Sequence, residues 1–237
     1  MTNPKNPTRL IFGTFSLLLA SGMLYISCTQ SKPAEKPSEA GNISKEMVSD
    51  MNWANDPNSF EIKDQTLFIS VKKGSDFFNN PEDSSVTATA PLLYQKITGD
   101  FVVKALVQPD FNAQWNAVSL MAHFDSLHWI KFAFENSDAT GPGIVSVVTN
   151  GVSDDANGVV LNEHKKVWLA LVRKKNNYSM HWSLDGQRYT MARLTSLPDL
   201  GEIKIGIEAQ SPVGESATHQ VHFFEIAERT VEDLRQL

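Results

Sequence analysis

Short runs of alternating apolar and polar residues recur along most of this chain, and they restrict its fold more than any other feature. Such alternation is typical of strands that bury one face of an antiparallel sheet. Gly, Pro, Asn and Asp bound the runs, as turns require. About nine strands without helices between them predict an all-β, two-sheet jelly-roll sandwich. The predicted strands are 66–72, 101–108, 117–124, 129–135, 144–149, 167–174, 178–184, 203–209 and 220–227.

Helical periodicity is nearly absent, so we expect only short peripheral helices. The best candidates are residues 231–237 and, more weakly, residues 45–51. Two turn signals are specific. Residues 174–177 (Lys-Lys-Asn-Asn) separate two alternating runs and predict a hairpin, while Asp185-Gly186 offers a residue that tolerates positive φ.

The N-terminus has the pattern of a bacterial lipoprotein signal peptide. Lys5 and Arg9 give it a positive start, residues 10–26 are almost wholly apolar or small, and Ser27 precedes Cys28, the single cysteine of the chain. In such proteins the cysteine becomes the lipid-bearing first residue of the mature chain. Each buried methylene of its acyl chains contributes roughly 0.8 kcal/mol to anchoring. We therefore expect lipidation at Cys28 and a lipid-anchored location in the bacterial cell envelope.

Two other interpretations of residues 1–28 remain open. Tyr25 stands where the lipoprotein motif usually has Leu, so the segment also fits an ordinary secretory signal. An uncleaved anchor is the third option, although the run is at the short end of the roughly 17–25 residues that a span needs. Residues 29–42 are rich in Ser, Lys, Pro and Glu and predict a disordered tether. Residues 43–237 then form one domain.

Composition excludes some partners. The chain carries 27 acidic and 21 basic residues, a balance that disfavours nucleic acid, whose phosphates require basic clusters. One cysteine allows no internal disulfide, so packing must supply the stability. The six histidines lack the spacing of a zinc motif, and no metal site is expected from them.

Six segments of the chain occur in one fixed order. They are Gly74-Ser75-Asp76-Phe77-Phe78, Gly99-Asp100-Phe101, residues 128–135, residues 145–149 with Ser153-Asp154, Leu184-Asp185-Gly186 and Ala209-Gln210-Ser211-Pro212. In these segments the chain resembles the "regulation of enolase protein 1" family of the concanavalin A-like lectin/glucanase superfamily, over nearly all of residues 53–226. The resemblance implies a jelly-roll sandwich and no established activity. Asp155 departs from the family pattern, since an aromatic residue is expected there.

Alternation sorts the residues of two strands by face. In 129–135 the apolar residues at 130, 132 and 134 share one face, so Trp129, Lys131 and Glu135 share the other. In 117–124 the corresponding polar side presents His123. In sandwiches of the superfamily that this chain resembles, ligands bind the concave outer face of one sheet. An indole that stacks on a pyranose beside charged groups that bind its hydroxyls would suit a carbohydrate. A solvated Lys131–Glu135 pair and a Trp129 packed under a loop are the structural alternative.

Two aspartates in the family-like segments are further candidates. Asp76 and Asp154 are expected in loops, where each contacts a ligand or caps a turn. Residues 154–158 (Asp-Asp-Ala-Asn-Gly) also offer oxygen ligands for Ca²⁺, but they lack the spacing and the bidentate Glu of an EF-hand loop.

Catalysis finds little support. Glycoside hydrolysis needs two carboxylates on either side of the scissile bond, and no strand here carries alternating acids. Glu135 would need a partner from another strand, for example Glu208. The preferred function is a lectin-like, envelope-anchored carbohydrate-binding domain. The alternatives are a glycoside hydrolase with non-standard acids and a structural or protein-binding lipoprotein of the envelope.

Overall fold

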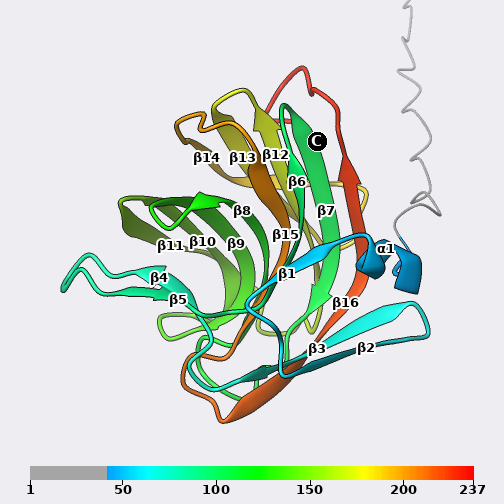
Figure 1. The fold of residues 1–237 in the computed structure, drawn as a ribbon, viewed down its shortest axis with the longest axis vertical. Coiled ribbons are helices and arrows are strands. Elements are labelled where there is room, and N and C mark those ends of the chain that lie inside the picture. The colour runs from blue at the N-terminus through cyan, green and yellow to red at the C-terminus, as the bar shows by residue number, and fades with distance from the viewer. Residues whose placement is uncertain (1–41) are drawn as a thin grey trace, which may run out of the picture. The chain divides into compact units, whose positions relative to one another are not determined.

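A computed structural model describes residues 42–237, which form two seven-stranded antiparallel sheets packed face to face (Figure 1). The predicted all-β sandwich is confirmed. Sheet A consists, in spatial order, of β1 (Asn52–Ala54), β6 (Leu92–Ile97), β15 (Ile203–Gln210), β8 (Ala117–Asp125), β9 (His128–Ser137), β10 (Gly141–Asn150) and β11 (Val152–Val160). Sheet B consists of β14 (Thr190–Ser196), β13 (Asn177–Ser183), β12 (Val167–Lys174), β7 (Phe101–Gln108), β16 (Ser216–Ala227), β3 (Thr66–Lys72) and β2 (Ser59–Lys63).

The main hydrophobic core lies between the two sheets. Every second residue of β9 points into it, and Ile130, Phe132 and Phe134 are fully buried there. Leu169 and Leu171 on β12 come from the opposite sheet and are also fully buried. Burial of one such side chain contributes about 1.5–3 kcal/mol. The core is thus built by the alternation that the sequence displays.

The outer face of sheet A is covered in part by a second, smaller hydrophobic cluster. Residues 73–91, which we call the cover segment, leave sheet B after β3 and include the hairpin of β4 (Phe77–Asn79) and β5 (Val86–Ala88) (Figure 1). Phe77 from this segment packs against Trp129, with ring centroids 6.1 Å apart, and joins a cluster with Met121 and Val147 of the sheet. Part of the outer face of sheet A is therefore closed to solvent.

Hydrogen bonds fix the cover segment to the sheet. The backbone N–H of Asn79 donates to Ser153 Oγ at 2.9 Å, and the Asn79 side chain donates to the carbonyls of Ser126 and Gly151 at 2.8 and 3.0 Å. At the other end, Ser211 N–H donates to Ser75 Oγ at 2.8 Å. Buried polar groups at both ends thus find partners, and the segment is held in place.

All nine predicted strands are present, within a few residues of their expected ends. The predicted hairpin joins β12 to β13, with Lys175 at a φ of 55°, and Gly186 has a φ of 70°. The weak helix near residue 45 is α1 (Lys45–Ser49), capped by Ser44. The predicted helix at 231–237 is wrong. That segment is irregular, because it is too short to form a stable helix alone and packs Val231 onto Val102 and Val172 instead.

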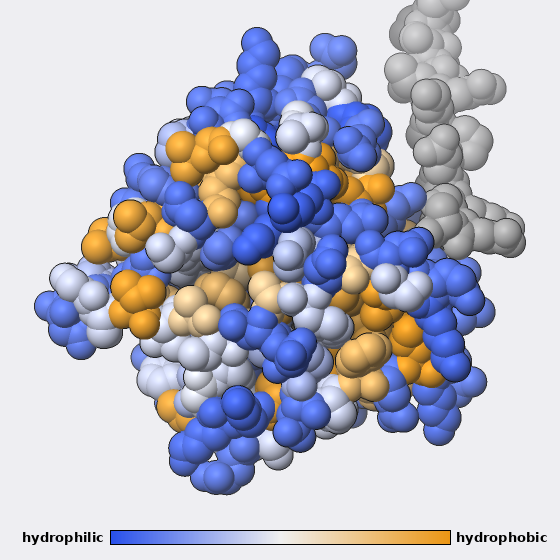
Figure 2. Space-filling model, viewed as in Figure 1, coloured by the Kyte–Doolittle hydropathy of each residue, from blue (hydrophilic) through white to orange (hydrophobic). Residues whose placement is uncertain are grey.

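The surface of the domain is mostly polar. In Figure 2 the apolar residues on the face shown lie in separate patches, and exposed apolar side chains such as Phe60 and Val86 come from different strands. Of the helices between residues 42 and 237, none has the length and apolar character to cross a membrane. Cys28, the predicted signal and nearly all of the predicted tether lie outside the described residues.

Candidate functional site

A pocket of about 270 Å³ opens on the outer face of sheet A, beside the cover segment. Its floor comes from neighbouring strands in register. Val147 on β10 lies between Lys131 on β9 and Asp155 on β11, and Ala117 on β8 lies between Glu135 on β9 and Gln210 on β15. Since all these residues share the outward phase of the pleat, their side chains reach the same face. The lining residues are Asp76, Phe78, Trp115, Lys131, Glu135, Asp138, Val147, Asp155 and Gln210.

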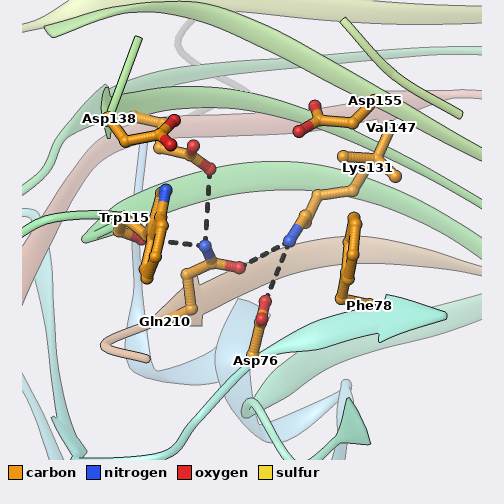
Figure 3. Close-up of a pocket in the computed structure, with 9 residues that line it drawn as sticks. Asp76, Phe78, Trp115, Lys131, Asp138, Val147, Asp155 and Gln210 are labelled. Carbon is orange, nitrogen blue, oxygen red and sulfur yellow. Dashed lines mark hydrogen bonds and ion pairs between the residues drawn. The ribbon is translucent and has the colours of Figure 1, made fainter. Parts of the chain in front are cut away.

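Lys131 is the centre of the polar network in this pocket. Its ammonium donates to Gln210 Oε1 at 2.7 Å, to the Phe77 carbonyl at 2.9 Å and to Asp76 Oδ1 at 3.1 Å (Figure 3). Its side chain is only 3% exposed. An ammonium has three protons, so the three acceptors use its full donor capacity. A buried cation of this kind is tolerated because every proton is matched.

Gln210 connects this network to the opposite wall. Its amide nitrogen donates to the Trp115 carbonyl at 2.8 Å and, over a longer 3.4 Å, to Glu135 Oε2. Figure 3 shows Gln210 in the middle of the pocket, between Lys131 and the two acceptors of its amide group. Gln210 thereby orients Lys131 and Glu135 relative to each other.

Two aromatic rings flank the polar network. Figure 3 shows Trp115 on one side of Gln210 and Lys131 and Phe78 on the other, and both side chains are partly exposed. Trp115 has a φ of 60°, a strained conformation for a bulky side chain. Its N–H donates to the Asn136 carbonyl at 2.7 Å, which together with the Gln210 contact holds it there. Such conformations cost about 1–3 kcal/mol and cluster at ligand sites.

The carboxyl groups around Lys131 are electrostatically coupled. Burial would lower the pKa of Lys131, but Asp76, Glu208 and Glu135 together raise it, so this side chain stays charged. Burial raises the pKa of Glu135 to about 8, against the lowering effect of Lys131. Burial likewise raises the pKa of Asp155. One ammonium is therefore shared by several acids, and Glu135 is protonated near neutral pH.

Comparison with known proteins places this domain in a family. The family model described as "Protein of unknown function (DUF1349)" matches residues 53–229. The chain belongs to the DUF1349 family. Among curated proteins, this DUF1349 chain is 23% identical over 165 residues to "Regulation of enolase protein 1" of Saccharomyces cerevisiae, covering 70% of this chain and 83% of the yeast protein.

Solved structures agree on the fold of this DUF1349 domain. A functionally unknown protein from Saccharomyces cerevisiae superposes with a TM-score of 0.72 and 20% identity, over 78% of this chain and 99% of that one. The exoplasmic/lumenal domain of VIP36, solved in a Ca²⁺/Man3GlcNAc-bound form, superposes with a TM-score of 0.53 and 11% identity, over 85% of this chain and 92% of that one. These similarities support the lectin-like sandwich predicted from the sequence.

The structure of the DUF1349 domain brings together three of the predicted site residues, Asp76, Lys131 and Glu135. The expectation that Trp129 offers an exposed indole is wrong. Its side chain shares the outward phase with Lys131, as predicted, but Phe77 of the cover segment packs on it and leaves it 1% exposed. Sequence alternation assigns a face correctly and says nothing of what covers that face.

The other two predicted ligand residues lie elsewhere in the DUF1349 domain. His123 is on the same face as Trp129 but does not line the pocket. Its ring lies edge-on to Phe77 with centroids 5.8 Å apart, and burial lowers its pKa to about 4. Asp154 is on β11 and not in a loop, and its carboxylate pairs with Arg193 at 2.7 Å. Asp76 lies in the cover segment outside its strands, as expected.

Several pocket residues of the DUF1349 domain escaped the sequence analysis. In the sequence, Gln210 stands out only within the family-like segment 209–212. Asp155 stands out as a departure from the family pattern and as part of the 154–158 segment, but not as a pocket residue. Trp115 follows a turn-rich stretch without alternation. Its role in the pocket depends on contacts with Asn136 and Gln210, which are distant in the sequence. Such long-range contacts leave no local pattern.

The possible Ca²⁺ segment at 154–158 of the DUF1349 domain lies within β11. Because successive side chains of a strand point to opposite faces, Asp154 and Asp155 do not converge on one point. Between residues 42 and 237, no three or more His, Cys, Asp or Glu residues are grouped so that they could hold a metal ion.

Proposed function

We propose that this protein is a carbohydrate-binding lipoprotein whose DUF1349 domain binds a glycan in the pocket on the outer face of sheet A. The observation that carries the proposal is the pair of partly exposed aromatic rings, Trp115 and Phe78, on either side of a fixed polar network. Aromatic faces stack on the apolar face of a pyranose, and polar groups between them bind its hydroxyls. The similarity of fold to a domain solved with Man3GlcNAc supports the same function.

The size of the pocket favours a small part of a glycan. Its volume of about 270 Å³ is just below the roughly 300–1,000 Å³ of typical small-molecule sites. One or two sugar units would fill it, and further units would extend over the exposed rim at Asp138 and Asp155. The strained backbone of Trp115 keeps one wall preorganised, which reduces the entropy lost on binding.

Anchoring is the second part of the proposal. Lipidation of Cys28 would attach the protein to a membrane of the bacterial cell envelope, and residues 29–42 would separate it from the bilayer. A glycan-binding domain held in this way would collect or present glycans at the envelope.

Binding to a glycan array tests the proposal. The full chain, purified in detergent, should bind a defined subset of glycans, and Trp115→Ala should weaken binding by about tenfold, since one stacking ring contributes roughly 1.4 kcal/mol. Trp53→Ala is the matched control. Trp53 is also partly exposed, but its ring contacts that of Phe60 in a tilted arrangement with centroids 5.5 Å apart, and it does not line the pocket.

Two results would contradict carbohydrate binding in this pocket. One is an array without signal for the wild-type chain. The other is equal loss of binding in the Trp115 and Trp53 variants, because that would place the glycan elsewhere or indicate general unfolding. Capture of a protein partner by a chain that ignores every glycan would favour the structural alternative.

One observation favours a second candidate, a glycan-active hydrolase. The raised pKa of Glu135, about 8, would keep it protonated near neutral pH, as a general acid requires. A carboxylate partner would have to come from Asp76, Asp138 or Asp155, because Glu208 is fully buried and does not line the pocket. Release of reducing ends by the wild type and its loss in Glu135→Gln would support this candidate. Binding without turnover supports the first.

A further inference from the structure

The polar groups of the pocket present acceptors to a ligand and few donors. The three protons of Lys131 bind Asp76, the Phe77 carbonyl and Gln210. Both protons of the Gln210 amide are directed to Trp115 and Glu135. Two side-chain donors of the described pocket residues remain without a protein acceptor. They are the indole N–H of Trp115 and the carboxyl proton of neutral Glu135.

Acceptors are more plentiful. Asp76 uses Oδ1 for the Phe77 N–H and for Lys131, while its Oδ2 accepts no hydrogen bond from residues 42–237. Glu135 accepts only the long bond from Gln210, on Oε2, and its Oε1 is without a donor from the same residues. Asp138 and Asp155 add exposed carboxylates at the rim. The pocket is thus lined by four acids and one cation whose donors are already used.

We infer that the ligand carries a protonated amine, as in an amino sugar that lacks its N-acetyl group. This inference rests on the proposed function and specifies the ligand class of the same pocket. Each hydroxyl of a neutral sugar has one donor and two acceptor sites, whereas an ammonium offers donors alone together with a positive charge. Carboxylates supply its counter-charge, and the faces of Trp115 and Phe78 attract a cation through their electron-rich π systems.

The protonated carboxyl group of Glu135 should make binding of an ammonium ligand depend on pH. It faces Lys131 on its own strand, Asp155 from β11, Asp76 from the cover segment and Glu208 from β15, so the acids around it outnumber the cation. An ammonium ligand would restore that balance, lower the pKa of Glu135 and release its proton. Binding near neutral pH is therefore coupled to proton release.

Calorimetry with three matched trisaccharides tests the inference. The probes are β-1,4-linked glucosamine, N-acetylglucosamine and glucose trimers, titrated into the full chain in detergent at about pH 7 in two buffers of different ionisation enthalpy. We expect the glucosamine trimer to bind at least about tenfold more tightly than the other two, the equivalent of about 1.4 kcal/mol. Its apparent enthalpy should depend on the buffer, as proton release requires, and its affinity should fall with added salt.

Variants distinguish binding of the amine in the pocket from its general attraction to an acidic protein. Glu135→Gln should abolish the dependence on buffer, and Asp155→Asn should reduce the preference for the amine severalfold. Asp154→Asn is the matched control, because the neighbouring carboxylate on β11 pairs with Arg193 and points away from the pocket. Melting temperatures of all three variants show that each is folded.

The outcomes distinguish the amine preference inferred here from the glycan binding proposed above. Preference for the glucosamine trimer with proton release supports the inference. Equal or tighter binding of the neutral or N-acetylated trimers overturns it and leaves the proposed glycan binding intact. Binding of none of the three, on an array that also shows no signal, overturns both. An amine preference that survives in Glu135→Gln and Asp155→Asn but falls in Asp154→Asn also overturns the inference.

Discussion

The buried carboxyl group of Glu208 should make the stability of the domain depend on pH. Its side chain is fully buried on the outer side of sheet A, and neither carboxyl oxygen has a hydrogen bond of good geometry with the described residues. Burial raises its pKa from 4.5 to about 7, against the lowering effects of Lys131 and Ser119. Because the folded-state pKa is raised, the stability that Glu208 contributes is present at low pH and is lost as pH rises toward the folded pKa.

The size of the effect follows from the two pKa values. A change from 4.5 in the unfolded chain to about 7 in the folded one corresponds to about 3 kcal/mol, at roughly 1.4 kcal/mol per unit. Between about pH 5 and pH 8, roughly 2–3 kcal/mol of that amount should be lost. Glu208→Gln removes the ionisable proton while keeping the shape of the side chain. Between about pH 5 and pH 8, the free energy of unfolding of the variant should therefore fall by about 2–3 kcal/mol less than that of wild type.

Melting temperatures of the full chain at the two pH values provide the assay. At roughly 2–4 °C per kcal/mol for a domain of this size, wild type should lose about 4–12 °C more than Glu208→Gln. A residual slope is expected in the variant, because Glu135 also has a raised pKa, about 8. Glu82→Gln is the control, since Glu82 is exposed on the cover segment. Identical pH slopes in wild type and Glu208→Gln would refute the reasoning.

Three further predictions concern other parts of the chain. Lys131→Met should destabilise the domain by about 3–5 kcal/mol, because it leaves Asp76 and Gln210 without their partner. Chemical denaturation measures this loss, and a loss below about 1 kcal/mol would contradict a stabilising role of the Lys131 hydrogen bonds. Gly186→Ala should lower stability by at least about 1 kcal/mol, because Gly186 has a φ of 70° and a Cβ would lie 2.7 Å from Trp168 Cε2; an unchanged melting temperature would contradict this. Cys28→Ser should move the protein from the membrane to the soluble fraction of a bacterial host, and retention in the membrane would argue against a lipid anchor.

The central strands could be predicted from the sequence because their side chains alternate between the core face and the opposite face of the sheet. In β9 the buried inner face and the outward position of Lys131 and Glu135 both follow from a period of two. Edge strands such as β1 and β2 do not stand out in the sequence, because strands of three and five residues are too short to display alternation. Local pattern thus reports the fold where the sheet is buried on at least one face.

The site was predicted only in part, for a different physical reason. The part of its floor that lies on β9, Lys131 and Glu135, follows from the alternation of that strand. Gln210 and Asp155 lie on other strands, and the walls come from the cover segment and from the loop that holds Trp115. The same cover segment buries Trp129, which the sequence suggested as the exposed indole. The aromatic wall is instead Trp115, which depends on contacts with Asn136 and Gln210. Contacts between distant segments decide which residues of a face meet solvent.

Sheet A separates two hydrophobic clusters by the thickness of one layer of backbone. Even-numbered positions of β9 belong to the sandwich interior, whereas odd-numbered positions belong to the side that carries the cover segment and the pocket. A longer or shorter cover segment would reshape the pocket on the outer face without disturbing the residues between the sheets. The scaffold and the pocket can therefore diverge at different rates during evolution, and relatives with this architecture need not share the same pocket.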